Sequence, residues 1–216
     1  MRAVIFDLDG TLCDSAPDLQ AAANRLLAGL GKAPLSLDMV RGFIGNGVPK
    51  LVERVMLASG IAFSPERHGD LTREFARIYG TDPVAGTVLY PGVRQVLDGL
   101  RSEGRAMGVC TNKVHHITMQ VLRGLEIDGY FGSVIGGDSL PVHKPDPAMM
   151  RACIGELGGT DVIYVGDSEV DAATALAAGI PFALFSGGYR KSPVEEIPHD
   201  ALFDDFSQLP DILGKI

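Results

Sequence analysis

Cysteine and long hydrophobic runs are scarce in this chain of 216 residues. Its three cysteines, Cys13, Cys110 and Cys153, form an odd set with no pair at metal-ligand or Cys-x-x-Cys spacing. This excludes a disulfide framework and favours a reducing compartment. No apolar run approaches the roughly 18–20 residues that span a bilayer, and the first run, residues 3–6, is too short for a signal peptide. We therefore expect a cytoplasmic protein without a membrane partner.

Basic residues are also few, with 19 Lys and Arg against 27 Asp and Glu, which gives a formal net charge of −8. A field of that sign repels polyphosphate chains, so the composition argues against nucleic acid as a partner. Apolar residues make up 46% and charged residues 21%, as in ordinary globular proteins. The length suits one domain with an insertion, in either a monomer or a homodimer.

Five short apolar runs have the composition of strands that are buried on both faces. They are residues 3–6, 106–110, 133–135, 162–165 and 181–185. Helical patterns lie between them, at 92–102, 114–124, 147–157 and 169–178. Strands that alternate with helices predict an α/β fold with a Rossmann-like, doubly wound parallel sheet.

Residues 15–86 interrupt this alternation, because they contain helical patterns and no convincing strand. Ser15 to Asp18 is typical of a helix start, with a capping residue, a first-turn proline and an acid three residues after the cap. Further helices are expected over 48–59 and 65–79. The sequence thus predicts a core of residues 1–14 and 87–216, with an inserted α-helical cap of residues 15–86 and hinges near Asp14 and Gly86.

The groups able to do chemistry are concentrated just after the expected strands. They are Asp7 and Asp9, then Thr111 and Asn112, then Lys144, and last Asp167 and Ser168. The carboxyl ends of parallel strands share one edge of the sheet, where these groups would meet. Carboxylates without nearby Cys or clustered His indicate a hard cation such as Mg²⁺. Asp7 could then attack phosphorus, with Asp9 as proton donor and acceptor.

Four segments resemble, in order, the motifs of the haloacid dehalogenase superfamily. They are Asp7-Leu8-Asp9-Gly10-Thr11-Leu12, Thr111-Asn112-Lys113, Lys144-Pro145-Asp146-Pro147 and Gly166-Asp167-Ser168-Glu169-Val170-Asp171. The resemblance implies Asp7 as nucleophile, Asp9 as general acid and base, and Lys144 as the neutralising cation. It implies Mg²⁺ on the Asp7 side chain, the Asp9 carbonyl and Asp167. Asp171 is a further candidate metal residue, which would bind the ion directly or through water, or would orient the site. Thr111 and Asn112 would bind the phosphoryl oxygens.

An acid at Asp9 argues against dehalogenation, which has no leaving oxygen to protonate. Within the superfamily, the segments 44–47, 51–54, 90–93 and 134–138 resemble the phosphoglycolate phosphatases. We expect the backbone of Gly45, Asn46 and Gly47 to receive a small substrate carboxylate, with Arg41 as an added charge. Lys113 is expected to snorkel beside the site.

Several alternatives stay open at this point. One is a sugar-phosphate mutase similar to β-phosphoglucomutase. Others are phosphatases for pyrophosphate, sugar phosphates or nucleoside monophosphates. A non-catalytic binding module is the alternative outside the enzymes.

Overall fold

The central element is a six-stranded parallel sheet, seen in a computed structural model that describes residues 2–159 and 161–215. Its strand order is β5-β4-β1-β6-β7-β8. The strands are β1 (Ala3–Phe6), β4 (Met107–Cys110), β5 (Ser133–Ile135), β6 (Val162–Gly166), β7 (Phe182–Phe185) and β8 (Ala201–Phe203). The five predicted strands are confirmed. Strand β8 was not predicted; it is an edge strand in which only Phe203 is buried.

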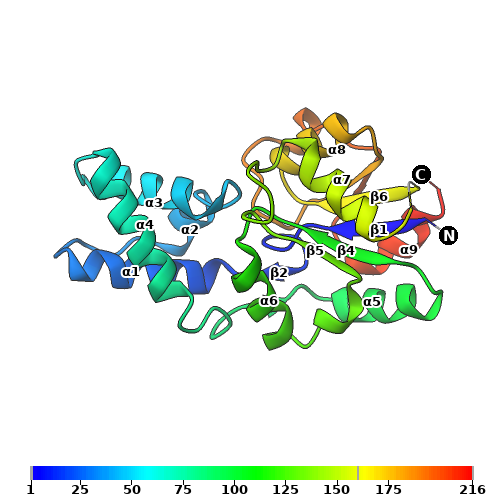
Figure 1. The fold of residues 1–216 in the computed structure, drawn as a ribbon, viewed down its shortest axis with the longest axis horizontal. Coiled ribbons are helices and arrows are strands. Elements are labelled where there is room, and N and C mark those ends of the chain that lie inside the picture. Colours follow the sequence, from blue (N-terminus) through cyan, green and yellow to red (C-terminus); the bar gives the residue numbers. More distant parts are fainter. Residues whose placement is uncertain (1, 160, 216) are drawn as a thin grey trace.

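Helices cover both faces of the sheet (Figure 1). One face carries α5 (Val93–Ser102), α6 (His115–Gly124) and α9 (Leu209–Leu213), and the other carries α7 (Pro147–Glu156) and α8 (Glu169–Ala178). Strand β1 shows why both faces need cover: Val4 and Phe6 pack into one buried cluster, and Ala3 and Ile5 into the other. The Rossmann-like expectation is therefore confirmed.

Three short 3₁₀ helices complete the core: η1 (Asp128–Tyr130), η2 (Val194–Glu196) and η3 (Phe206–Gln208). Within the described ranges, no helix is both long and apolar enough to cross a membrane.

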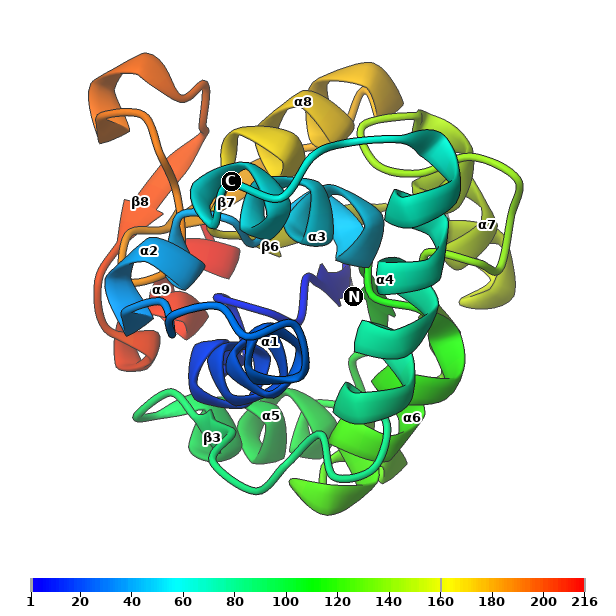
Figure 2. The same cartoon turned by 90° about the vertical axis from the view of Figure 1, so that its left-hand side faces the viewer.

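Four helices between β2 and β3 lie together beyond the carboxyl ends of the sheet strands, as Figures 1 and 2 show. They are α1 (Ala16–Gly29), α2 (Leu37–Arg41), α3 (Gly47–Ala58) and α4 (Pro65–Tyr79). Helix α4 packs against both α1 and α3. Their apolar residues, Leu27 and Phe75 among them, belong to the same buried cluster as the α5 face of the sheet. Apolar packing is thus continuous from these helices into the core.

The two chain segments that lead to and from these helices are paired with each other. Strand β2 (Cys13–Asp14) runs antiparallel to β3 (Val88–Leu89), a pairing that the sequence did not reveal. Helix α1 starts where predicted, but the expected side-chain capping at Ser15 is wrong. The Ser15 hydroxyl donates to Asp9 instead. Asp18 accepts hydrogen bonds from the backbone of Gly86 and Thr87 at 2.8 Å, so it ties α1 to the returning segment.

Candidate active site

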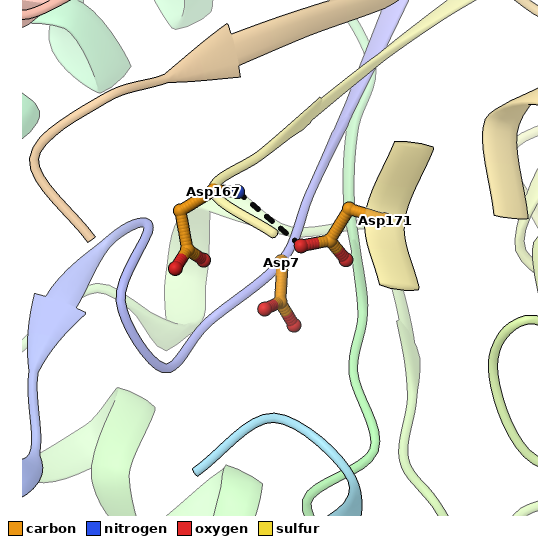
Figure 3. A group of neighbouring side chains, drawn as sticks. All are labelled: Asp7, Asp167 and Asp171. Atoms are coloured by element: carbon orange, nitrogen blue, oxygen red, sulfur yellow. Dashed lines mark hydrogen bonds between the residues drawn. The ribbon is translucent and has the colours of Figure 1, made fainter. Parts of the chain in front are cut away.

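Three carboxylates converge at the carboxyl ends of the central strands. Asp7 follows β1, Asp167 follows the neighbouring β6, and Asp171 lies in the first turn of α8. One oxygen from each lies within 4.8 Å of the others, and all three residues are buried. Figure 3 shows Asp167 and Asp171 on either side of Asp7. The topology therefore assembles acids that are up to 164 positions apart (171 − 7) in the sequence.

Lys144 is the cation inside this group. Its Nζ lies 2.8 Å from Asp7 Oδ1 and 2.7 Å from Asp171 Oδ1, and it donates to the Tyr164 hydroxyl at 2.8 Å. Burial by itself disfavours the ammonium form, but Asp171 and Asp7 outweigh burial and raise the pKa of Lys144. Lys144 therefore stays charged between the two acids.

Both oxygens of Asp171 are already engaged by protein donors. Oδ1 accepts from Lys144 and from the Tyr164 hydroxyl at 2.7 Å. Oδ2 accepts from the Ser168 hydroxyl at 2.6 Å and from the backbone of Asp167 and Ser168. Burial opposes ionisation, yet Lys144 and these donors lower the pKa of Asp171 below its usual value. This bonding favours a role for Asp171 in orienting Lys144, and its contact with a metal, direct or through water, stays a prediction.

Asp7 and Asp167 carry the charge that a metal ion would balance. Burial raises the pKa of Asp7 to about 6, although Lys144 acts in the opposite direction. Burial and repulsion from Asp171 and Asp7 raise the pKa of Asp167 well above its usual value. Such repulsion between buried carboxylates, with oxygen as the only donor atom, fits a hard divalent cation such as Mg²⁺.

The Asp167 carboxylate sits in a tight cradle. It accepts from the Thr11 hydroxyl at 2.8 Å and from the backbone N–H of Tyr189 at 2.6 Å. A Cβ on Gly10, whose φ is +90°, would lie 2.5 Å from Asp167 Oδ2, and one on Gly188 would lie 2.3 Å from it. Only glycine leaves room for the carboxylate at these two positions.

The Asp9 side chain is not part of the three-carboxylate group and pairs with Lys113. Lys113 Nζ lies 2.8 Å from both Asp9 oxygens, and the Ser15 hydroxyl donates to Oδ1 at 2.5 Å. The expectation that Lys113 snorkels to solvent is wrong, since its side chain is 4% exposed. Its ammonium lies 4.8 Å from the ring centroid of Tyr79 on α4. The Asp9 carbonyl, and not its side chain, thus stays the predicted metal ligand.

The Asn112 side chain bridges two loops through hydrogen bonds. Its Oδ1 accepts from the backbone N–H of Lys144 at 2.9 Å. Its Nδ2 donates to the carbonyls of Lys144 at 3.2 Å and Gly45 at 3.3 Å. The side chain therefore joins the Lys144 loop to the loop before α3. Thr111 accepts from the Lys113 N–H, and its role toward a phosphoryl group stays a prediction.

A cavity of about 40 Å³ lies between the strand ends and the helices. Its core walls are Asp7, Asp9, Thr111, Asn112, Lys113 and Lys144, and its other walls are Leu19, Ile44, Gly45, Gly47, Val48 and Leu51. Asn46 lines an adjacent cavity that also reaches Asp7 and Asp167. Arg54 holds this loop by donating to the Phe43 carbonyl at 2.6 Å and to Asn46 Oδ1 at 2.8 Å. Arg41, expected near the substrate, instead pairs with Asp14 at 2.8 Å.

The geometry agrees with comparisons to known proteins. A model of the haloacid dehalogenase-like hydrolase family matches residues 1–179. The chain belongs to this family. A phosphoglycolate phosphatase of Cereibacter sphaeroides is 50% identical over 100% of this chain and 99% of its own length. One from Rhodobacter capsulatus is 43% identical over 98% of this chain and 96% of its own length.

Among solved structures, a protein of Haemophilus somnus described as a predicted phosphoglycolate phosphatase matches this hydrolase with a TM-score of 0.92. It is 31% identical, over 99% of this chain and 98% of that one. The resemblance identified from the four motifs is thus confirmed at the level of the family and the fold.

The hydroxyl contacts of two tyrosines, Tyr164 and Tyr189, were not predicted from the sequence. Tyr164 reads as part of a buried strand, yet its hydroxyl contacts both Lys144 and Asp171. The Tyr189 hydroxyl accepts from the Ser15 and Ala16 N–H groups and donates to Asp14 at 2.6 Å. Neither the apolar run around Tyr164 nor the segment Gly187-Gly188-Tyr189-Arg190 carries a local sign that the tyrosine hydroxyl has a charged partner, so spacing alone could not reveal either contact.

Proposed function

We propose that this hydrolase converts 2-phosphoglycolate to glycolate and phosphate, using Mg²⁺ and a covalent intermediate on Asp7. The observation that carries the proposal is that Asp7 and Asp9 line one small cavity, with Lys144 beside Asp7. The names of the relatives described above support the substrate.

In the first step, an Asp7 oxygen attacks phosphorus and the bond from phosphorus to the bridging oxygen breaks. Asp9 donates a proton to that oxygen, so glycolate leaves and an acyl phosphate stays on Asp7. In the second step, Asp9 takes a proton from a water that attacks phosphorus, which releases phosphate and restores the Asp7 carboxylate.

The surrounding residues bind and orient the reacting groups. Lys144 offsets the charge of Asp7 and of the phosphoryl oxygens. The Asp7 side chain, the Asp9 carbonyl and Asp167 would hold Mg²⁺, which supplies positive charge for the phosphoryl oxygens when bound. Asp171 keeps Lys144 in place through their 2.7 Å contact.

Residues 15–86 act as a cap in this proposal. Two polar contacts join the loop before α3 to the core, from Asn112 Nδ2 to the Gly45 carbonyl and from Lys191 Nζ to the Ile44 carbonyl at 3.3 Å. Substrate entry requires these contacts to open, and closure then excludes bulk water from the acyl phosphate. Motion is expected at the β2 and β3 segments.

The three cysteines are free and buried, which supports a reducing compartment such as the cytoplasm. A small phosphate ester is the expected partner. Either a monomer or a homodimer is compatible with the proposal.

A panel of phosphate esters with Mg²⁺ tests the function. It contains 2-phosphoglycolate, pyrophosphate, hexose phosphates and nucleoside monophosphates, ranked by kcat/KM. We expect 2-phosphoglycolate to rank first and inorganic phosphate to be released. Isomerised sugar phosphate without phosphate release would instead indicate a mutase, and no turnover of any ester would indicate a binding module.

The role of Asp7 is tested with a matched pair of variants. Asp7→Asn removes the nucleophile and should lower kcat on the order of 10⁵-fold. Asp70→Asn is the control, because Asp70 pairs with Arg73 on the exposed surface of α4. Equal turnover in Asp7→Asn and the wild type would contradict the covalent route.

A further inference from the structure

Lys113 is a buried cation that the proposed mechanism does not use. Two lysines line the cavity, Lys144 and Lys113. Lys144 has a task beside Asp7, whereas Lys113 pairs with the carboxylate of Asp9, which must act on the leaving group. A buried ion pair contributes little to stability, because desolvation offsets the attraction of the charges. Its presence beside the cavity therefore calls for a different explanation.

Geometry places Lys113 next to the leaving group. Asp9 must come within hydrogen-bond reach of the bridging oxygen, about 3 Å, to protonate it. Lys113 Nζ lies 2.8 Å from both oxygens of Asp9. In a phosphate ester of a 2-hydroxy acid, the carboxylate carbon is two bonds from the bridging oxygen. The carboxylate of such a substrate therefore falls where the Lys113 ammonium can donate to it.

The residues of 15–86 that line the cavity carry no charged side chain, so they offer an anion no competing cation. Leu19, Val48 and Leu51 are apolar. Helix α3 begins at this wall, and the Asn46 side chain does not cap its first turn. The positive end of the α3 dipole at this wall suits a carboxylate.

We propose that Lys113 determines specificity by binding a carboxylate on the leaving group. The substrate carboxylate replaces Asp9 as the partner of Lys113, and Asp9 becomes free to turn toward the bridging oxygen. This inference rests on the proposed phosphatase function and names its substrate class: small phosphate monoesters with a carboxylate on the ester carbon. An ester without that carboxylate leaves Asp9 bound to Lys113, so its kcat is lower and its KM is higher.

The test compares 2-phosphoglycolate with ethyl phosphate, which has nearly the same size and no carboxylate. We expect the wild type to prefer 2-phosphoglycolate on the order of 10³-fold in kcat/KM. Lys113→Met should lower kcat/KM for 2-phosphoglycolate about 100-fold and should not lower that for ethyl phosphate, because Asp9 is then no longer held by Lys113. The preference then falls to about tenfold or less. Lys50→Met is the matched control, because Lys50 pairs with Glu53 on the exposed side of α3.

The ratio of the two substrates within one variant does not depend on how much of the protein is folded. If Lys113→Met is insoluble, Lys113→Gln gives the same measurement. A wild type without preference, or a Lys113 variant that loses both activities equally, overturns the role of Lys113 while the phosphatase function stands. Failure of the wild type to hydrolyse any ester overturns the proposed function, and this inference with it.

Discussion

The two buried lysines beside the cavity differ in the elements that surround them. Lys144 is enclosed by residues of the sheet domain alone, namely Asp7, Tyr164 and Asp171. Lys113 is held by Asp9 but also faces the Tyr79 ring of α4. The half of the site that would handle phosphorus is therefore built from residues outside 15–86. The half that would handle the leaving group is completed by residues 15–86.

Among the variants that distinguish these two halves of the site, substitution of Lys144 should lower kcat/KM the most. Lys144→Met leaves Asp7 and Asp171 without their shared cation, so kcat/KM should fall about 10³-fold. Because Lys144 serves the phosphoryl group, the loss should be equal for 2-phosphoglycolate and ethyl phosphate. Steady-state kinetics on both esters measures this. A loss of kcat/KM for only one of the two esters would contradict the different roles assigned to Lys144 and Lys113.

Asp9 tests the other half at the step of proton transfer. Asp9→Asn should lower kcat on the order of 10²- to 10³-fold, because the amide cannot donate a proton to the leaving oxygen. Mg²⁺ and phosphate should raise the melting temperature of this variant as much as we expect for the wild type, since the three-carboxylate group is intact. Turnover at the wild-type rate would exclude Asp9 from the mechanism.

Metal binding should depend on pH through the half of the site that contains Asp7. Burial raises the pKa of Asp7 to about 6, so in the metal-free protein this carboxyl keeps a proton that the unfolded chain loses above about 4. The contribution of Asp7 to metal-free stability thus falls as pH rises from about 4 through about 6. Mg²⁺ binds the ionised form, so binding releases protons and tightens over the same window.

Saturating Mg²⁺ should consequently raise the melting temperature more at about pH 7.5 than at about pH 5. Differential scanning fluorimetry at the two pH values measures the shift, and Asp167→Asn should abolish it. A shift that is larger at the lower pH would contradict this account of the acids.

Substitution of two buried tyrosines, Tyr164 and Tyr79, should have the smallest effects, which are on stability, and still distinguish the two halves of the site. Tyr164→Phe removes a hydroxyl that contacts Lys144 and Asp171, so it should cost about 1–2 kcal/mol of unfolding free energy. Tyr79→Phe removes a hydroxyl without a described hydrogen bond and should change stability by less than about 0.5 kcal/mol. Chemical denaturation of both variants without substrate gives the comparison, and equal losses would refute it.

The sheet was predictable because strands that are buried on both faces have apolar residues at consecutive positions. Runs such as residues 3–6 are apolar at every position, and the structure places them between two layers of helices. Strand β8 and the β2–β3 pair escaped, since Leu202 and Val88 are exposed and such short strands have no period to detect. Asp18 was misinterpreted for a related reason: its spacing fits a helix cap, while its actual partners are Gly86 and Thr87.

The order of the motifs by itself determined which acids stand at the strand ends, because a residue after a buried strand has its position fixed by the strand. Only the tertiary structure decided which partner each charged group takes. Lys113 pairs with Asp9, which is 104 positions away in the sequence, and the Asn112 amide donates hydrogen bonds to the carbonyls of Lys144 and Gly45. Such choices depend on distances of a few ångströms between distant segments, and burial makes them consequential, because a desolvated charge must have a partner.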